Sequence, residues 1–156
     1  MNPCRRSHIV VTGASSGIGR ATALELAAAG HHVFAGVRQL ADAPAPPAAS
    51  LGEITPVLLD VTDPVQIGAA AGTVAGHIGD DGLNGLVNNA GIGVFGPLEI
   101  TPLGEFRCQL EINVTGQLAV TQALLPLLRE ARGRIVLIGS IGSRFTPPIH
   151  RPGLGV

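Results

Sequence analysis

The residues with the potential to bind a ligand or take part in catalysis are glycines and serines near the N-terminus, with an asparagine and a serine farther along the chain. Residues 12–19 read Thr-Gly-Ala-Ser-Ser-Gly-Ile-Gly. Glycines at a turn between a strand and a helix let the backbone approach a pyrophosphate group, which then lies at the N-terminus of the helix. An apolar, β-branched run precedes this turn and a helix-forming run follows it, so we interpret it as a dinucleotide-binding turn, with a purely structural turn as the alternative. The residues expected to contact the cofactor here are Gly13, Ser15, Ser16, Gly17, Ile18 and Gly19.

The elements that must position this turn alternate along the chain. Short apolar runs bounded by turn residues predict strands over 8–12, 33–37, 54–59, 83–88 and 134–138. Between them the sequence predicts helices over 17–29, from an N-cap at Asp63 to about 77, and over 102–132 with a bend near Pro126. Residues 41–50 are rich in proline and predict a connection that is not helical throughout.

Alternation of strand and helix predicts one α/β domain over residues 1–156 with a doubly wound, Rossmann-type parallel sheet. Right-handed crossovers give the expected strand order 3-2-1-4-5. The order reverses between the first and fourth strands, so a ligand is expected at their carboxyl ends.

Composition excludes several other classes of function. Hydrophobic residues make up 46% of the 156 residues and charged residues 13%, which excludes a disordered chain. A net charge of −1 provides no field that would attract nucleic acid or an anionic membrane, so neither is an expected partner. Cys4, Cys108 and the five histidines show no metal-ligand spacing, and no metal is expected. Without a signal-peptide pattern, a cytoplasmic location with two reduced cysteines is the expectation.

Four further motifs follow the glycine turn. They are Asp60-Val61 after the third strand, Asn88-Asn89-Ala90-Gly91 after the fourth, Asn113 within Ile-Asn-Val-Thr-Gly, and Ser140 after the fifth strand. Together the five motifs resemble the short-chain dehydrogenase/reductase family, and within it the branch that acts on retinol and steroid alcohols. The resemblance implies hydride transfer between a nicotinamide cofactor and a small-molecule alcohol or carbonyl.

The resemblance also implies a role for each motif. Asp60 and Val61 would contact the adenine, and residues 88–91 would steady the sheet beside the cofactor. Ser140 would orient the substrate oxygen, and Asn113 would hold a water molecule in a proton relay.

Charge at the end of the second strand favours NADP(H) over NAD(H). An NAD site usually places an acidic residue there to bind the ribose 2′-hydroxyl, whereas an arginine suits a 2′-phosphate. The expected acidic position falls on Val37, and Arg38 follows it. A solvated surface arginine is the alternative interpretation of Arg38.

The family's tyrosine and lysine, which carry the proton transfer, are absent. The sequence contains no tyrosine, and its ten basic residues are all arginines. The position of the tyrosine falls on Gly153, and that of the lysine falls beyond Val156. His150 follows Ser140 but is expected to be a loop histidine. An unassisted serine hydroxyl is a poor acid at neutral pH, so this chain is expected to lack turnover.

The same departure predicts an incomplete domain, because the family's later helix and strands would cover the fifth strand. That strand is then an exposed edge able to pair with a second copy or a full-length relative. We therefore expect a truncated oxidoreductase or, alternatively, a non-catalytic NADP(H)-binding or partner-binding protein. A domain for another adenine-containing ligand is a third interpretation, under which residues 88–91, Asn113 and Ser140 have no purpose.

Overall fold

A five-stranded parallel sheet carries the fold. The computed structural model describes residues 6–46, 48, 50–94 and 96–140. Its strands lie in the order β3-β2-β1-β4-β5, as the sequence predicts. The predicted residues Cys4, His150 and Gly153 lie outside the described part of the chain.

Each strand pairs in parallel with its neighbours. β1 (His8–Thr12) lies between β2 (His32–Val37) and β4 (Gly85–Asn88). β3 (Glu53–Leu58) pairs with β2, and β5 (Arg134–Leu137) pairs with β4. Pro56 lies within β3, at the edge of the sheet, where the missing N–H costs no hydrogen bond on the unpaired side.

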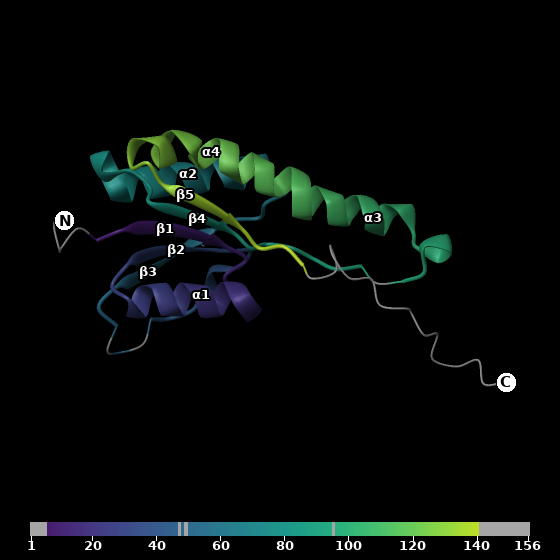
Figure 1. Cartoon of the computed structure of the whole chain (residues 1–156), viewed down its shortest axis with the longest axis horizontal. Helices are drawn as coiled ribbons and strands as arrows, with labels where there is room; N and C mark the ends of the chain where they lie inside the picture. The colour runs from purple at the N-terminus through teal and green to yellow at the C-terminus, as the bar shows by residue number, and fades with distance from the viewer. Residues whose placement is uncertain (1–5, 47, 49, 95, 141–156) are drawn as a thin grey trace.

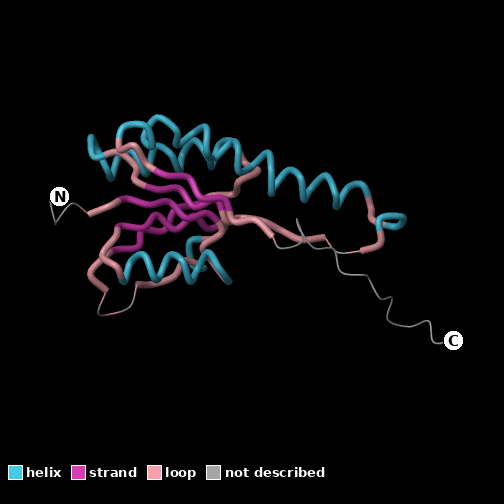
Figure 2. The backbone as a smooth tube through the Cα atoms, viewed as in Figure 1, coloured by secondary structure: helices cyan, strands magenta, loops and turns pink. Residues whose placement is uncertain are grey.

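Helices cover both faces of the sheet (Figure 1). α1 (Gly17–Ala28) packs on one face, and α2 (Pro64–Ile78) and α4 (Gln117–Glu130) pack on the other. α3 (Leu103–Leu110) and the π-helical η4 (Glu111–Gly116) precede α4 and extend beyond the sheet (Figure 2). The short 3-10 turns are η1 (Leu40–Asp42), η2 (Gly79–Asp81) and η3 (Leu98–Ile100).

Alternation along the strands divides the core into two clusters. Val10 and Phe34 point to the face that α2 and α4 cover, whereas Val11 and Val33 point to the face that α1 covers. Successive side chains of a strand point to opposite faces, so β1 and β2 are buried on both sides. This double burial explains why their sequences are almost uniformly apolar.

The start of α2 is set by local chemistry that the sequence predicts correctly. Asp63 is the N-cap, and its carboxylate accepts hydrogen bonds from Val65 N at 2.8 Å and Gln66 N at 3.3 Å. Pro64 occupies the first helical position, where its missing N–H would have no intrahelical partner.

The helix predicted over 102–132 departs from regular geometry at a different place than expected. The irregular turn is η4, and α4 continues as a helix through Pro126. Gly116 lies in this turn, where a Cβ would come within 2.7 Å of Val61 O. The turn therefore lies where the helix approaches the backbone that follows β3.

Apolar side chains remain exposed on β5 and along the outer side of α3–α4. All residues of β5 are exposed, including Ile135, Val136 and Leu137. Phe106, Leu110, Val114 and Leu118 are also exposed on the helices. Among the described residues β5 pairs only with β4 and lies at one edge of the sheet.

Candidate functional site

One cleft at the carboxyl ends of the strands collects nearly all the predicted site residues. Its volume is about 880 Å³, and it lies at the reversal of strand order between β1 and β4. The predicted residues that line it are Gly13, Ser15, Ser16, Gly17, Ile18, Arg38, Asp60, Val61, Asn89, Ala90, Gly91, Asn113 and Ser140. This is the position at which doubly wound sheets bind their ligands.

The glycine turn needs glycine for two different reasons. Gly13 and Gly17 have φ values of +64° and +53°, in the left-handed region that side chains disfavour. Gly19 has no such angle, but a Cβ there would collide with Asn89 Nδ2 and Gly13 O. Gly19 does not line the cleft; its role is to let α1 pack against the turn.

The start of α1 lines the cleft. Ser16 is the N-cap with an extended backbone, and its carbonyl accepts a hydrogen bond from Arg20 N at 3.1 Å. Its side chain does not cap the helix. Ser15, Ser16 and Gly17 line the cleft, so the positive end of the helix dipole and the first N–H groups face it.

Asn89 joins the segment after β4 to the glycine turn. Its Nδ2 donates to Thr12 O at 3.0 Å and to Gly13 O at 3.1 Å. In return, Thr12 Oγ1 accepts from the backbone N–H groups of Asn89 and Ala90, each at 2.9 Å. These bonds fix the two walls of the cleft relative to each other.

Asn88 lies outside the cleft, although the sequence groups it with its neighbours. It is completely buried, and its Nδ2 donates to Thr121 Oγ1 at 2.9 Å. Its Oδ1 accepts no hydrogen bond from the described residues. Asn88 therefore anchors β4 to α4, whereas Asn89 lines the cleft.

Asp60 is held as a carboxylate at the cleft wall. Its Oδ1 accepts from Thr62 N at 2.9 Å and from Thr62 Oγ1 at 2.7 Å. These hydrogen bonds, with a smaller contribution from Arg38, lower the pKa of Asp60 below its ordinary value. Asp60 is thus an acceptor at neutral pH, and the exposed Arg38 lines the same cleft.

Asn113 and Ser140 come to the same cleft from different elements. Asn113 lies in η4, and its side chain binds the backbone of Ile92. Ser140 follows β5, and the last residue of β5, Leu137, also lines the cleft. The structure therefore brings together two residues that are 27 positions apart in the sequence.

Several cleft residues were not anticipated from the sequence. Gln117 lines the cleft and donates from Nε2 to Ala90 O at 3.2 Å. Gln109 does not line the cleft, but its Oε1 accepts from Val94 N, in the segment after β4, at 2.6 Å. The spacing of Gln109, Asn113 and Gln117 at intervals of four on one helix is a signal that could have identified them. The other unanticipated residues are Gly36, Val37, Leu59, Thr62, Ile92, Cys108, Ile112, Leu137, Ile138 and Gly139.

The described part of the chain contains neither a cluster of metal ligands nor a helix suited to span a membrane. Residues 6–140, apart from the three undescribed positions among them, contain no group of three or more histidine, cysteine, aspartate or glutamate side chains that could hold a metal ion. None of the helices described in that same part has the length and apolar character that a bilayer crossing requires.

Comparisons with known proteins agree with this geometry. The model of the family described as short chain dehydrogenase matches residues 7–151. Retinol dehydrogenase 5 of Mus musculus is 40% identical over 144 residues, covering 92% of this chain and 45% of the relative. The chain therefore spans about half the length of the curated relatives it matches.

Solved structures have the same architecture. A short-chain dehydrogenase from Streptomyces avermitilis has a TM-score of 0.82 at 37% identity, covering 92% of this chain and 52% of the other. An alcohol dehydrogenase from Thermococcus sibiricus, complexed with 5-hydroxy-NADP, has a TM-score of 0.80 at 27% identity, covering 92% and 62%. The sheet order, the glycine turn and the extent of the family match lead to one conclusion: this chain belongs to the short-chain dehydrogenase family.

Proposed function

We propose that this chain forms the cofactor-binding part of an NADP(H)-dependent oxidoreductase that acts on an alcohol/carbonyl pair. Members of its family are oxidoreductases that bind NAD(P) cofactors. The observation that carries the proposal is the single cleft in which the glycine turn, Arg38, Asp60, Asn113 and Ser140 meet. A bound nicotinamide cofactor would supply hydride transfer there.

The residues of the cleft fit such a cofactor. Its volume of about 880 Å³ is in the range of small-molecule and cofactor pockets. Gly13 and Gly17 leave the backbone bare at the start of α1, where a pyrophosphate would bind. Asp60, with its lowered pKa, offers a carboxylate acceptor for an adenine amino group.

Arg38 supports NADP(H) in preference to NAD(H). It follows β2 and lines the cleft, at the place where Rossmann-type domains recognise the ribose. A guanidinium group there would bind a 2′-phosphate through charge-assisted hydrogen bonds. The side chain of the adjacent Val37 has no oxygen that could accept a hydrogen bond from a 2′-hydroxyl.

We propose that Ser140 orients the substrate oxygen and that Asn113 belongs to the proton relay. The 156-residue chain contains neither tyrosine nor lysine, so the group that would transfer the proton is absent from it. A serine hydroxyl alone is a poor acid at neutral pH. This chain on its own is therefore expected to bind the cofactor without turnover.

A second candidate is a non-catalytic protein that binds NADP(H) and pairs with another chain. The exposed apolar residues of β5 and of the outer side of α3–α4 favour it, because they would be covered by a second copy or a full-length relative. Its net charge of −1 supports neither nucleic acid nor membrane as the partner. A cytoplasmic location stays a prediction under both candidates.

The test is calorimetric titration of the purified chain with NADPH and, separately, with NADH. Saturable binding that is tighter for NADPH is the expected result. Turnover is tested in a chain extended by the C-terminal half of a relative, which supplies the tyrosine and lysine. That protein should oxidise NADPH in the presence of an aldehyde or ketone. Absence of NADPH binding by both proteins would overturn the proposal.

A further inference from the structure

A row of polar side chains runs along the helical segment from α3 through η4 into α4. They occur at intervals of four residues, and each makes a hydrogen bond to the last residue of β4 or to the segment that follows it. We call this row the polar ladder: Gln109, Asn113, Gln117 and Thr121.

Two members of the ladder, Thr121 and Gln117, contact the end of β4 and the residue two positions beyond it. Thr121 Oγ1 accepts from Asn88 Nδ2 at 2.9 Å, and Gln117 Nε2 donates to Ala90 O at 3.2 Å. Gln117 is only 7% exposed, so its amide has little access to water as an alternative partner. Removing this donor would leave the carbonyl oxygen of Ala90 without its hydrogen bond from Gln117.

The other two members, Asn113 and Gln109, contact residues farther along the segment that follows β4. Asn113 binds both backbone groups of Ile92, and Gln109 accepts from Val94 N at 2.6 Å. Four residues back along the helix therefore correspond to two residues forward along the segment. All four contacts obey this rule.

The two repeats match in length. Four residues of an α-helix rise about 6 Å, and two residues of an extended chain advance about 6.6 Å. Four residues of an α-helix also turn about 40° beyond a full circle, which would carry the row off the contact line. A π-helical turn rotates less per residue, and η4 lies at the centre of the row, so it offsets this drift.

Asn89, between the two residues that contact Thr121 and Gln117, has a different partner. Its Nδ2 donates away from the helix, to Thr12 O and Gly13 O. Its backbone N–H and that of Ala90 both bind Thr12 Oγ1. The backbone of Ala90 is thus held on both sides, by Gln117 at its carbonyl and by Thr12 at its N–H.

We propose that Gln117 is a positioning residue for the cofactor site. It fixes the carbonyl of Ala90 and thereby holds Asn89 against the glycine turn, so that the two walls of the cleft keep the spacing a cofactor needs. This inference rests on the proposed NADP(H) function for its effect on affinity. Its effect on the segment itself is independent of any ligand.

The test compares three glutamine substitutions on α4. Gln117→Met removes the donor at every pH. Gln117→Glu keeps the size of the side chain; a neutral acid can donate to Ala90 O, whereas a carboxylate cannot. Gln122→Glu is the matched control, because Gln122 is an exposed glutamine on the same helix.

Amide hydrogen exchange in the absence of cofactor is the first measurement. Gln117→Met should raise exchange at Asn89 and Ala90 about tenfold over the parent, while the amides of β2 stay protected. Gln117→Glu should match Gln117→Met at pH 9, where its carboxyl is ionised, and should move toward the parent as the pH falls and the carboxyl takes up a proton. Gln122→Glu should match the parent throughout.

The second measurement is the affinity for NADPH, determined by calorimetry. Gln117→Met should weaken binding about tenfold, and Gln117→Glu should weaken it increasingly as the pH rises. Parent-like exchange at Asn89 and Ala90 in Gln117→Met would overturn the proposal, as would a rise shared equally by β2, which indicates global unfolding. If the parent itself does not bind NADPH, the proposed function fails, and the exchange result still decides the role of Gln117.

Discussion

Asn113 and Ile92 hold each other by two hydrogen bonds that run in opposite directions. Ile92 N donates to Asn113 Oδ1 at 2.9 Å, and Asn113 Nδ2 donates to Ile92 O at 2.8 Å. The amide side chain thus pairs with the backbone as a neighbouring strand would. The proposed relay asparagine is therefore also a structural link between η4 and the wall of the cleft.

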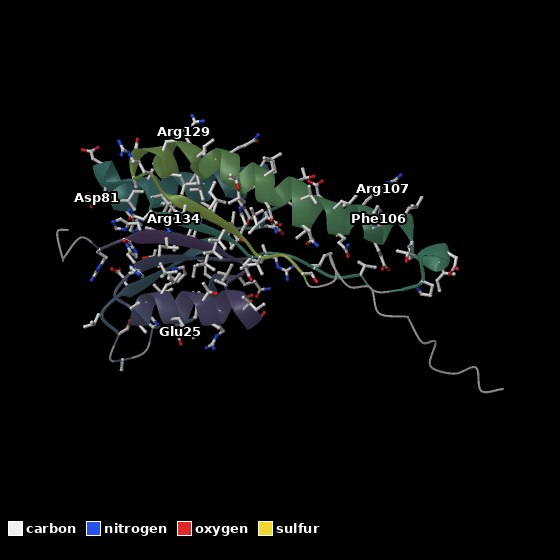
Figure 3. The ribbon with its side chains drawn as sticks, viewed as in Figure 1. Glu25, Asp81, Phe106, Arg107, Arg129 and Arg134 are labelled. Atoms are coloured by element: carbon white, nitrogen blue, oxygen red, sulfur yellow. The ribbon has the colours of Figure 1, made fainter. Side chains whose placement is uncertain are left out.

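Substitution of Arg38 tests the choice of cofactor. Arg38→Asp should weaken NADPH binding about 10- to 100-fold, because it removes a charge-assisted contact and puts a negative charge beside the 2′-phosphate. NADH binding should not weaken. The control is Arg129→Asp on the last turn of α4, because Arg129 does not line the cleft. Figure 3 shows Arg129 at the opposite end of the helical segment from Phe106 and Arg107. Equal losses for the two variants would contradict the role of Arg38.

Gly19→Ala should damage the cleft from a position that does not line it. The new Cβ would collide with Asn89 Nδ2 and Gly13 O, both of which belong to the link between the glycine turn and the segment after β4. Overpacking of this kind costs about 1–3 kcal/mol. We expect a lower urea midpoint and loss of NADPH binding by calorimetry. A variant as stable as the parent would show that α1 can shift without cost.

Gly72→Ala should have the opposite effect on stability. Gly72 is exposed in the middle of α2, and a Cβ there meets nothing within 4 Å. Replacing a mid-helix glycine with alanine stabilises by about 0.5–1 kcal/mol, because the unfolded chain loses conformational freedom. Urea unfolding should show a higher midpoint, and NADPH affinity should equal that of the parent. No gain in the midpoint would mean that α2 is not helical at this position.

Histidines at the opposite end of the sheet predict a pH dependence of stability. His32 is buried, with Nδ1 at 3.3 Å from His8 Nδ1 and Nε2 at 2.8 Å from Thr55 Oγ1. Burial lowers its pKa below 6.5, helped by His8, Arg6 and His77 and opposed by Glu53. Asp81 lies on the far side of His8, with its Oδ2 at 3.8 Å from His8 Nε2.

The direction in which stability changes with pH follows from proton uptake by His32. Below pH 6.5 the unfolded chain protonates this histidine before the folded chain does, so stability falls as the pH falls. Above that pH both states are neutral and the contribution is constant. Urea unfolding between pH 8 and pH 5 should show a steep loss in the parent and a shallower one in His32→Gln. Identical slopes would show that His32 is not the titrating group.

The exposed edge strand predicts self-association. Val136 is 48% exposed on β5, beside an unpaired backbone edge within the described part of the chain. Sedimentation velocity should show concentration-dependent association in the parent and less of it in Val136→Lys, since charged residues protect strand edges. The same change at Leu51, which is 79% exposed in a loop, should leave association unchanged. A parent that stays monomeric at all concentrations would contradict this expectation.

Local and patterned features were accessible from the sequence. The strand order follows from alternation and the handedness of crossovers, and the structure has that order. The glycine turn and the Asp63 cap depend on neighbouring residues, so their chemistry can be recognised without knowing the fold. Thirteen predicted site residues line one cleft, because parallel strands end at a common edge.

Only the tertiary structure decided how those residues are held. Asn88 and Asn89 are adjacent and identical in type, yet one is buried against Thr121 and the other clamps the glycine turn. The irregular turn at η4 and the alignment of Gln117 with Ala90 are also invisible in the sequence. Each depends on the fit between a helix and a distant segment, and that fit is set by packing distances rather than by the local preference of any residue.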